Sequence, residues 1–201
     1  MVVIGLDWSI TSPAWTIIDS DGRYVHHYFV QRNRKNSKKD ESNLKVVDDV
    51  ESKMESFHPY YYPEFDCSMN RFYLLSEALV DSVITYDMYN MKVVFEGYSF
   101  GATGKVFDIA ECTGIAKQAL YREYGLIPTV VPSAQWKKHF GLKGNSDKKP
   151  IVDLYIERTG NDLYSIFNKK PDIKSLGVMS DIADSYFIAM YALEDSKNDI
   201  D

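Results

Sequence analysis

The sequence has few of the residues that build disulfide-rich or zinc-bound folds. Its 201 residues include only two cysteines, Cys67 and Cys112, which lack metal-ligand spacing. Two isolated cysteines do not make a disulfide framework, and they favour a reducing compartment. The four histidines also lack the spacing of zinc ligands, and the adjacent pair His26 and His27 would point to opposite faces of a strand. The sequence therefore argues against a zinc enzyme.

Long apolar runs and leader-like segments are also lacking. No run approaches the roughly 20 apolar residues that cross a bilayer. The opening residues 1–5 do not show the charged and apolar pattern of a signal peptide. We therefore expect a cytosolic protein with no membrane partner.

Positive charge is in deficit overall but is gathered in two segments. The formal net charge is −6, which by itself disfavours binding to phosphates. Residues 31–39 nevertheless hold five cations and no anion, and residues 137–149 hold five lysines against one aspartate. Acid concentrates elsewhere, at 47–66 and after Leu193. Separated charge allows a basic cleft on an acidic protein, although solvated loops explain each cluster equally well.

The order of apolar patterns predicts an α/β fold in a single domain, 1–201. Three strands open the chain, with an Asp21-Gly22 hairpin turn between the second and third. Two later strands alternate with helices, so we predict a mixed five-stranded sheet, three antiparallel strands and then two parallel, flanked by helices. The predicted strands are 2–7, 14–19, 24–30, 92–96 and 127–131, and the helices are 70–90, 104–124, 133–140, 151–158 and 180–193. Ser133 and Ser180 are predicted to cap their helices, and 141–149 is predicted to form a basic loop.

Residues 32–66 fit this pattern poorly. A short helix near 46–57 is one interpretation of them. The run from His58 to Pro63 cannot lie inside a helix, and we expect it to form an ordered loop. The segment is therefore predicted to be an atypical insertion in the domain.

Four acids stand in apolar surroundings at the ends or faces of predicted elements. Asp7 ends the first strand and Glu96 ends the fourth, whereas Asp181 and Asp184 are three apart in the last helix and share one face. Acids so placed are costly to desolvate unless a cation compensates them. Their oxygen ligands suit Mg²⁺ or Mn²⁺, and two such ions would support phosphodiester hydrolysis. Singly, each acid has a plainer explanation as a turn residue, an ion-pair partner or a residue favoured by the helix dipole.

The same acids lie in motifs that resemble those of the RuvC class of Holliday junction resolvases, in the ribonuclease H-like superfamily. The resemblance rests on Gly5-Leu6-Asp7, Val94-Phe95-Glu96-Gly97 and the closing run Ser180-Asp181-Ile182-Ala183-Asp184-Ser185-Tyr186-Phe187-Ile188-Ala189. The segments 110–114 and 131–132 fall where that family has its central helix and fifth strand. A Pro-Gly pair that often follows the first acid is replaced by Trp8-Ser9. This departure and the acidic charge suggest a divergent member of bacteriophage or other viral origin. The resemblance implies a location in the cytoplasm of a bacterium or of a phage-infected host.

The resemblance implies a homodimeric endonuclease that cleaves four-way junctions and other branched DNA. It also implies two Mg²⁺ ions, with Mn²⁺ as a substitute, and products with a 5′ phosphate and a 3′ hydroxyl. The implied catalytic residues are Asp7, Glu96, Asp181, Asp184 and Lys148, of which the four acids are the metal ligands. The expected nucleic-acid-binding residues are Lys137, Lys138, Lys143, Lys149, Lys105, Tyr98, Phe100, Arg32, Arg34 and Lys35.

Other functions remain open at this point. The same four acids would serve a nuclease acting on flaps, other branched DNA or RNA–DNA hybrids, and the oligomeric state separates these, since symmetric junction cleavage needs two active sites. A catalytically silent nucleic-acid-binding protein would be expected to have lost an acid. A sugar kinase or actin-like ATPase would need a second glycine-rich phosphate loop, which the sequence lacks.

Overall fold

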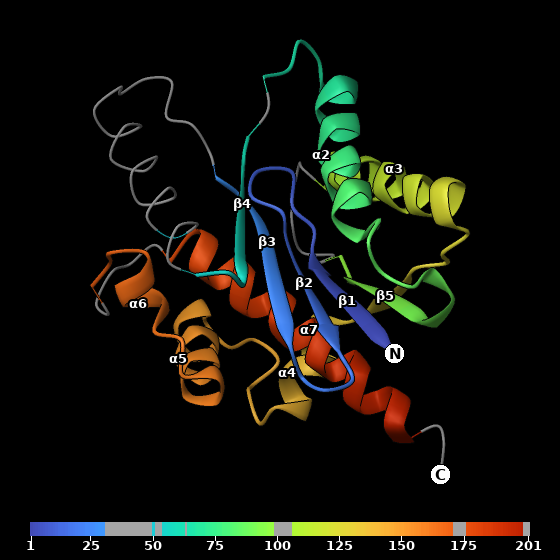
Figure 1. Ribbon diagram of the computed structural model, residues 1–201. Coiled ribbons are helices and arrows are strands. Elements are labelled where there is room, and N and C mark those ends of the chain that lie inside the picture. Colours follow the sequence, from blue (N-terminus) through green and yellow to red (C-terminus); the bar gives the residue numbers. More distant parts are fainter. Residues whose placement is uncertain (31–49, 51–53, 63, 99–105, 171–175, 199–201) are drawn as a thin grey trace.

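A six-stranded mixed sheet lies between helices in the computed structural model, which describes residues 1–30, 50, 54–62, 64–98, 106–170 and 176–198 (Figure 1). The strands are β1 (Val2–Asp7), β2 (Ala14–Asp19), β3 (Tyr24–Val30), β4 (Phe57–Tyr61), β5 (Met91–Glu96) and β6 (Thr129–Val131). Their order across the sheet is β4-β3-β2-β1-β5-β6. Strands β1, β2 and β3 are antiparallel neighbours, and β5 and β6 continue the sheet in parallel with β1. The predicted mixed sheet flanked by helices is confirmed.

The helices cover both faces of this sheet. They are α2 (Ser68–Val83), the 3₁₀ turn η1 (Met88–Asn90), α3 (Val106–Tyr124), α4 (Ser133–His139), α5 (Lys148–Thr159), α6 (Leu163–Ile166) and α7 (Val178–Asn198). Helices α4, α5 and α7 pack on one face, whereas α2 and α3 pack together on the other (Figure 1). In the part of the chain that the structure describes, none of these helices is long and apolar enough to span a membrane.

Strand β4 is the main addition to the predicted sheet. It runs parallel to β3 at the edge, in a register that pairs Pro59 with Tyr28. The expected ordered loop at 58–63 is therefore wrong for 58–61. Proline lacks the N–H group of a central strand but is tolerated at an edge, where one side of the backbone needs no partner. Most of the predicted insertion, and of the helix considered near 46–57, lies outside the described residues.

The alternation of side chains along the strands creates two cores. In β1, Val3 belongs to the core under α7, whereas Ile4 and Leu6 belong to the core under α2 and α3. The same alternation in β5 sends Val94 towards α7 and Phe95 to the other side. His26 and His27 also lie on opposite faces, as expected: His26 contacts Tyr155 of α5, and His27 stacks on Trp15.

Several helix ends differ from the predictions. Helix α5 begins at Lys148, three residues earlier than expected, so this lysine lies in a first helical turn and not in a loop. Helix α7 begins at Val178, which places Ser180 inside the helix and not at its cap. Helix α4 has Pro132 at its cap and Ser133 as its first residue. Helix α2 ends at Val83, well short of 90, and η1 occupies the last three residues of the predicted range.

Candidate functional site

Two of the predicted acids end neighbouring parallel strands. The register between β1 and β5 pairs Leu6 with Phe95, and the next residue on each strand is Asp7 and Glu96. Because side chains alternate along a strand, Asp7 lies on the same face as Val3, and Glu96 on the same face as Val94. Both acids are therefore directed to the face that α7 covers, at the carboxyl end of their strands.

Helix α7 brings the other two acids to this face. Asp181 and Asp184 are 6% and 7% exposed, so both carboxyl groups are largely removed from water. The helix crosses β1 and β2 closely because Gly5 presents no side chain to its backbone. All four predicted acids are thus assembled from two strand ends and one helix face.

Two of the acids are held by hydrogen bonds from side chains distant in sequence. Ser12 Oγ donates to Asp181 Oδ2 at 2.7 Å, and Lys148 Nζ donates to Asp181 Oδ1 at 3.2 Å. The indole Nε1 of Trp136, in α4, donates to Glu96 Oε1 at 3.2 Å. These contacts fix the orientation of one acid from α7 and one from the sheet.

Asp184 has a carboxylate oxygen shut off from water. Its Oδ1 atom is buried and has no hydrogen-bond partner among the described residues. Burial, with the nearby charge of Glu96, raises the pKa of Asp184 to about 8, although Lys137 and Lys148 act in the opposite direction. A proton or a cation is therefore favoured at this carboxyl group.

The charged form of Asp7 is disfavoured for the same reasons. Burial raises its pKa well above the usual range, and the charges of the other three acids add to the effect in the order Asp181, Glu96, Asp184. Lys148 opposes this shift. The four acids are thus close enough to repel one another, and the site as a whole has a deficit of positive charge.

Lys148 is the predicted lysine that the structure places among these acids. Burial lowers its pKa, but the charges of Asp181 and Asp7 outweigh that effect and raise it. Its Nζ also lies 2.9 Å from Ser180 Oγ. The lysine therefore stays protonated and acts as a counter-charge to the acids.

The expected nucleic-acid-binding residues differ in their exposure and in their contacts. Lys137 is half-buried, and its Nζ atom lies 5.2 Å from the centroid of the Trp136 ring. Its positive charge acts to lower the pKa of Asp184. Tyr98 follows Glu96 by two residues and is also half-buried. Lys138, Lys143 and Lys149 are exposed, and Lys149 pairs with Asp153 at 2.7 Å. The predicted residues Lys105, Phe100, Arg32, Arg34 and Lys35 lie outside the described residues.

The acids do not form a closed metal cage as they stand. Within the described part of the chain, no three aspartate, glutamate, histidine or cysteine side chains are grouped tightly enough to hold an ion. Both oxygens of Asp181 accept hydrogen bonds, from Ser12 and from Lys148. Each carboxylate oxygen keeps a second lone pair, so the obstacle to an ion at Asp181 is the positive charge of the Lys148 ammonium.

Sequence reasoning missed three side chains that shape the site. Ser12, Trp136 and Ser180 each contact an acid or Lys148. Ser12 and Trp136 are separated from their acids by 169 and 40 positions, so their roles depend on the folded topology. Only Ser180 has a sequence signal, its position beside Asp181, and the pattern there predicts a helix cap.

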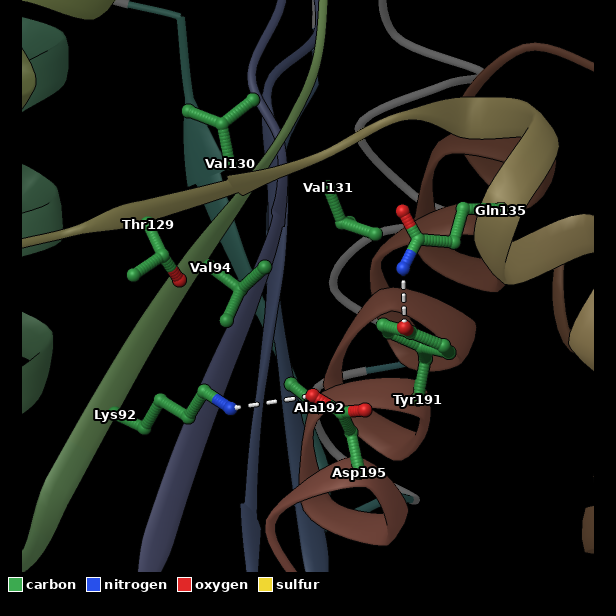
Figure 2. A pocket seen from close by; sticks show the side chains of 9 residues that line it. All are labelled: Lys92, Val94, Thr129, Val130, Val131, Gln135, Tyr191, Ala192 and Asp195. Carbon is green, nitrogen blue, oxygen red and sulfur yellow. Dashed lines mark hydrogen bonds and ion pairs between the residues drawn. The ribbon is translucent and has the colours of Figure 1, made fainter. Parts of the chain in front are cut away.

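A separate pocket of about 230 Å³ lies along β5 and β6 beside the later turns of α7 (Figure 2). Its polar groups are satisfied within the protein. Lys92 Nζ donates to Ser196 Oγ at 3.0 Å and lies 3.8 Å from Asp195, and Gln135 donates to Tyr191 at 2.6 Å. Since these groups pair with one another, the pocket offers no free reactive group, and the four acids remain the candidate site.

Comparison with known proteins identifies the fold of this chain. No protein-family model and no curated protein sequence matches the chain. Among solved structures, RuvC from Thermus thermophilus is similar with a TM-score of 0.53 and 13% identity, covering 97% of each chain. The same protein in complex with a Holliday junction substrate is similar with a TM-score of 0.54 and 13% identity, covering 98% of this chain and 97% of that one. The chain therefore has a divergent RuvC-like fold of the ribonuclease H-like type.

Proposed function

We propose that this protein is a divalent-metal-dependent DNA endonuclease that resolves four-way junctions. The main support for the proposal is the arrangement of the four acids. Asp7 and Glu96 lie at two adjacent strand ends, on the sheet face covered by the helix that carries Asp181 and Asp184. Carboxylates without sulfur or imidazole neighbours are the ligand set of hard cations. The RuvC-like fold is the second support.

The residues present fit such ions. The orphaned Oδ1 of Asp184 and the raised pKa values of Asp7 and Asp184 both indicate a site in which added positive charge would be stabilising. Asp7 and Glu96 would hold ions from the sheet, and the two α7 acids would hold them from the opposite side. When bound, two Mg²⁺ ions, or Mn²⁺ as a substitute, supply an activated water and neutralise charge on the departing 3′ oxygen.

The surrounding side chains position the reacting groups. Trp136 orients Glu96, and Ser12 orients Asp181, through single hydrogen bonds. The ammonium groups of Lys148 and Lys137 lie beside the acids and would bind the phosphate that is cleaved. Cleavage would leave a 5′ phosphate and a 3′ hydroxyl.

A four-way junction is the proposed substrate, and a homodimer the proposed assembly. A similar protein is known in complex with a Holliday junction substrate. Paired symmetric cuts need two sites related by a two-fold axis. Helix α3 is a candidate interface, because Phe107 and Tyr121 are 81% and 62% exposed while its opposite side is buried in the core. Sedimentation with and without junction DNA tests the dimer.

A comparison of substrates tests the proposal. A labelled four-way junction, a flap, a linear duplex and an RNA–DNA hybrid are each incubated with Mg²⁺, with Mn²⁺ and with chelator. Paired symmetric nicks in the junction alone, lost with chelator, are expected. Preference for the flap or the hybrid would keep the nuclease but change its substrate. No cleavage of any substrate with either ion would favour a nucleic-acid-binding protein.

A further inference from the structure

The two acids of α7 differ in how fully their oxygens are occupied. Asp181 accepts hydrogen bonds at both oxygens, from Ser12 at Oδ2 and from Lys148 at Oδ1. Asp184, one turn along the same face, has a buried Oδ1 atom without a partner among the described residues. One potential metal ligand is therefore engaged by the protein itself, and the other is not.

Lys148 is the main hydrogen-bond donor to the Oδ1 atom of Asp181. Ser180 Oγ also lies 3.1 Å from this oxygen, but its single hydroxyl hydrogen is shared with the carbonyl of Gly177, which is closer at 2.8 Å. The Lys148 ammonium carries three donors and makes contact with both Asp181 and Ser180. Loss of Lys148 would therefore free Oδ1, while Ser12 would still orient the carboxylate through Oδ2.

Lys148 is placed so that it can leave this contact. It is the first residue of α5, and its side chain is 60% exposed, against 8% for Asp181. Its stem can therefore rotate towards solvent without disturbing a core. A divalent cation at Asp181 would repel the ammonium across a few ångströms, so the two cations compete for the same carboxylate.

We propose that Lys148 is an internal competitor for the divalent cation at Asp181 and exchanges onto a DNA phosphate when substrate binds. The inference rests on the proposed function, since it concerns the same site. In the DNA-free protein, the ion pair keeps metal affinity low. A backbone phosphate offers the ammonium another anion, which frees Asp181 Oδ1 for the ion. Metal and DNA would then each strengthen the binding of the other.

Mn²⁺ binding to the DNA-free protein tests the first half, measured by the loss of the free-ion signal in electron paramagnetic resonance. The variants are Lys148→Met, which keeps the apolar stem, and Lys92→Met as the matched control, since Lys92 pairs with Asp195 at the separate pocket. Lys148→Met is expected to bind Mn²⁺ about tenfold more tightly than wild type. Lys92→Met is expected to bind as wild type does.

Junction affinity tests the second half, measured by fluorescence anisotropy in chelator and in Ca²⁺. The gain in affinity on adding Ca²⁺ is expected to be larger in wild type than in Lys148→Met, because only wild type has the lysine to release. Equal or weaker Mn²⁺ binding by Lys148→Met, or an equal Ca²⁺ gain, would overturn the competition and leave the nuclease proposal standing. Failure of both proteins to bind Mn²⁺ at all would overturn the metal-dependent function as well.

Discussion

Gly5 of β1 lies directly beneath Ala189 of α7, so close that a Cβ atom at Gly5 would stand 2.2 Å from the Ala189 backbone nitrogen. The carbonyl oxygen of Ser185 would be 2.5 Å away. Backbone atoms cannot move aside as a flexible side chain can. The absence of a side chain at Gly5 therefore sets how near the helix that carries Asp181 and Asp184 comes to the strand that carries Asp7.

Gly5→Ala is expected to lower the free energy of unfolding by about 3 kcal/mol, because the added methyl group pushes α7 away from β1. Denaturant unfolding measures the change. Gly114→Ala is the matched control: a Cβ there meets no atom within 4 Å, and alanine in a helix is favoured by about 1 kcal/mol. Equal stability of the Gly5→Ala variant and wild type would contradict the close packing.

Removing Ser12 is expected to slow cleavage without weakening DNA binding. Ser12→Ala deletes the hydrogen bond to Asp181 Oδ2, and loss of such an orienting partner costs about 10–100-fold in activity or metal affinity. Single-turnover cleavage and junction binding are measured in parallel. Ser12→Thr, which keeps the hydroxyl group, should restore most of the rate. An unchanged rate and unchanged Mg²⁺ dependence in Ser12→Ala would show that this contact does not position the acid.

Lys137 is expected to contribute one phosphate contact. Junction affinity should fall steeply as salt rises, and Lys137→Gln should reduce the slope of log affinity against log salt by about 1. Lys92→Gln is the control, because Lys92 is engaged with Ser196 and Asp195 at the separate pocket. The same slope in wild type and Lys137→Gln would remove Lys137 from the interface.

The buried histidines predict a difference in acid sensitivity. Burial, and the neighbouring His58, lower the pKa of His27 to about 3. The unfolded chain takes up a proton near pH 6.5 that the folded protein refuses, so His27 destabilises the fold as pH falls from 7 to 5, by about 2 kcal/mol. His27→Phe keeps a ring to stack on Trp15 and removes this effect.

The comparison is made between the two proteins, because the raised pKa of Asp184 acts in the opposite direction in both. Over this pH range, wild type should lose about 2 kcal/mol of unfolding free energy relative to His27→Phe. Urea unfolding at several pH values measures it. Parallel pH profiles for the two proteins would show that His27 is protonated in the folded state.

The sequence could predict the parts of this molecule that follow from short-range patterns. Short apolar runs predict the strands that end at Asp7 and Glu96, and a three-residue spacing places Asp181 and Asp184 on one helix face. Strand β4 was missed because Pro59 is unfavourable in most strands and the edge position is visible only in the folded sheet.

Short-range sequence patterns do not predict the hydrogen bonds of the site. Trp136 contacts Glu96 only because α4 packs under the end of β5, and Ser12 reaches Asp181 only because α7 crosses β1. Nothing in the sequence near either residue indicates these contacts. Lys148 was chosen by family resemblance, and its ion pair with Asp181 gives that choice a physical basis.

Cleavage of a labelled four-way junction by wild type and by Asp7→Asn, measured beside junction binding, tests the central claim most directly. Asp7 faces the three other acids, and its amide replacement keeps the shape while removing a metal-binding charge. The account predicts that Asp7→Asn binds the junction as wild type does and cleaves it about 10³-fold more slowly in Mg²⁺. Cleavage by Asp7→Asn at the wild-type rate would contradict a metal-dependent carboxylate site.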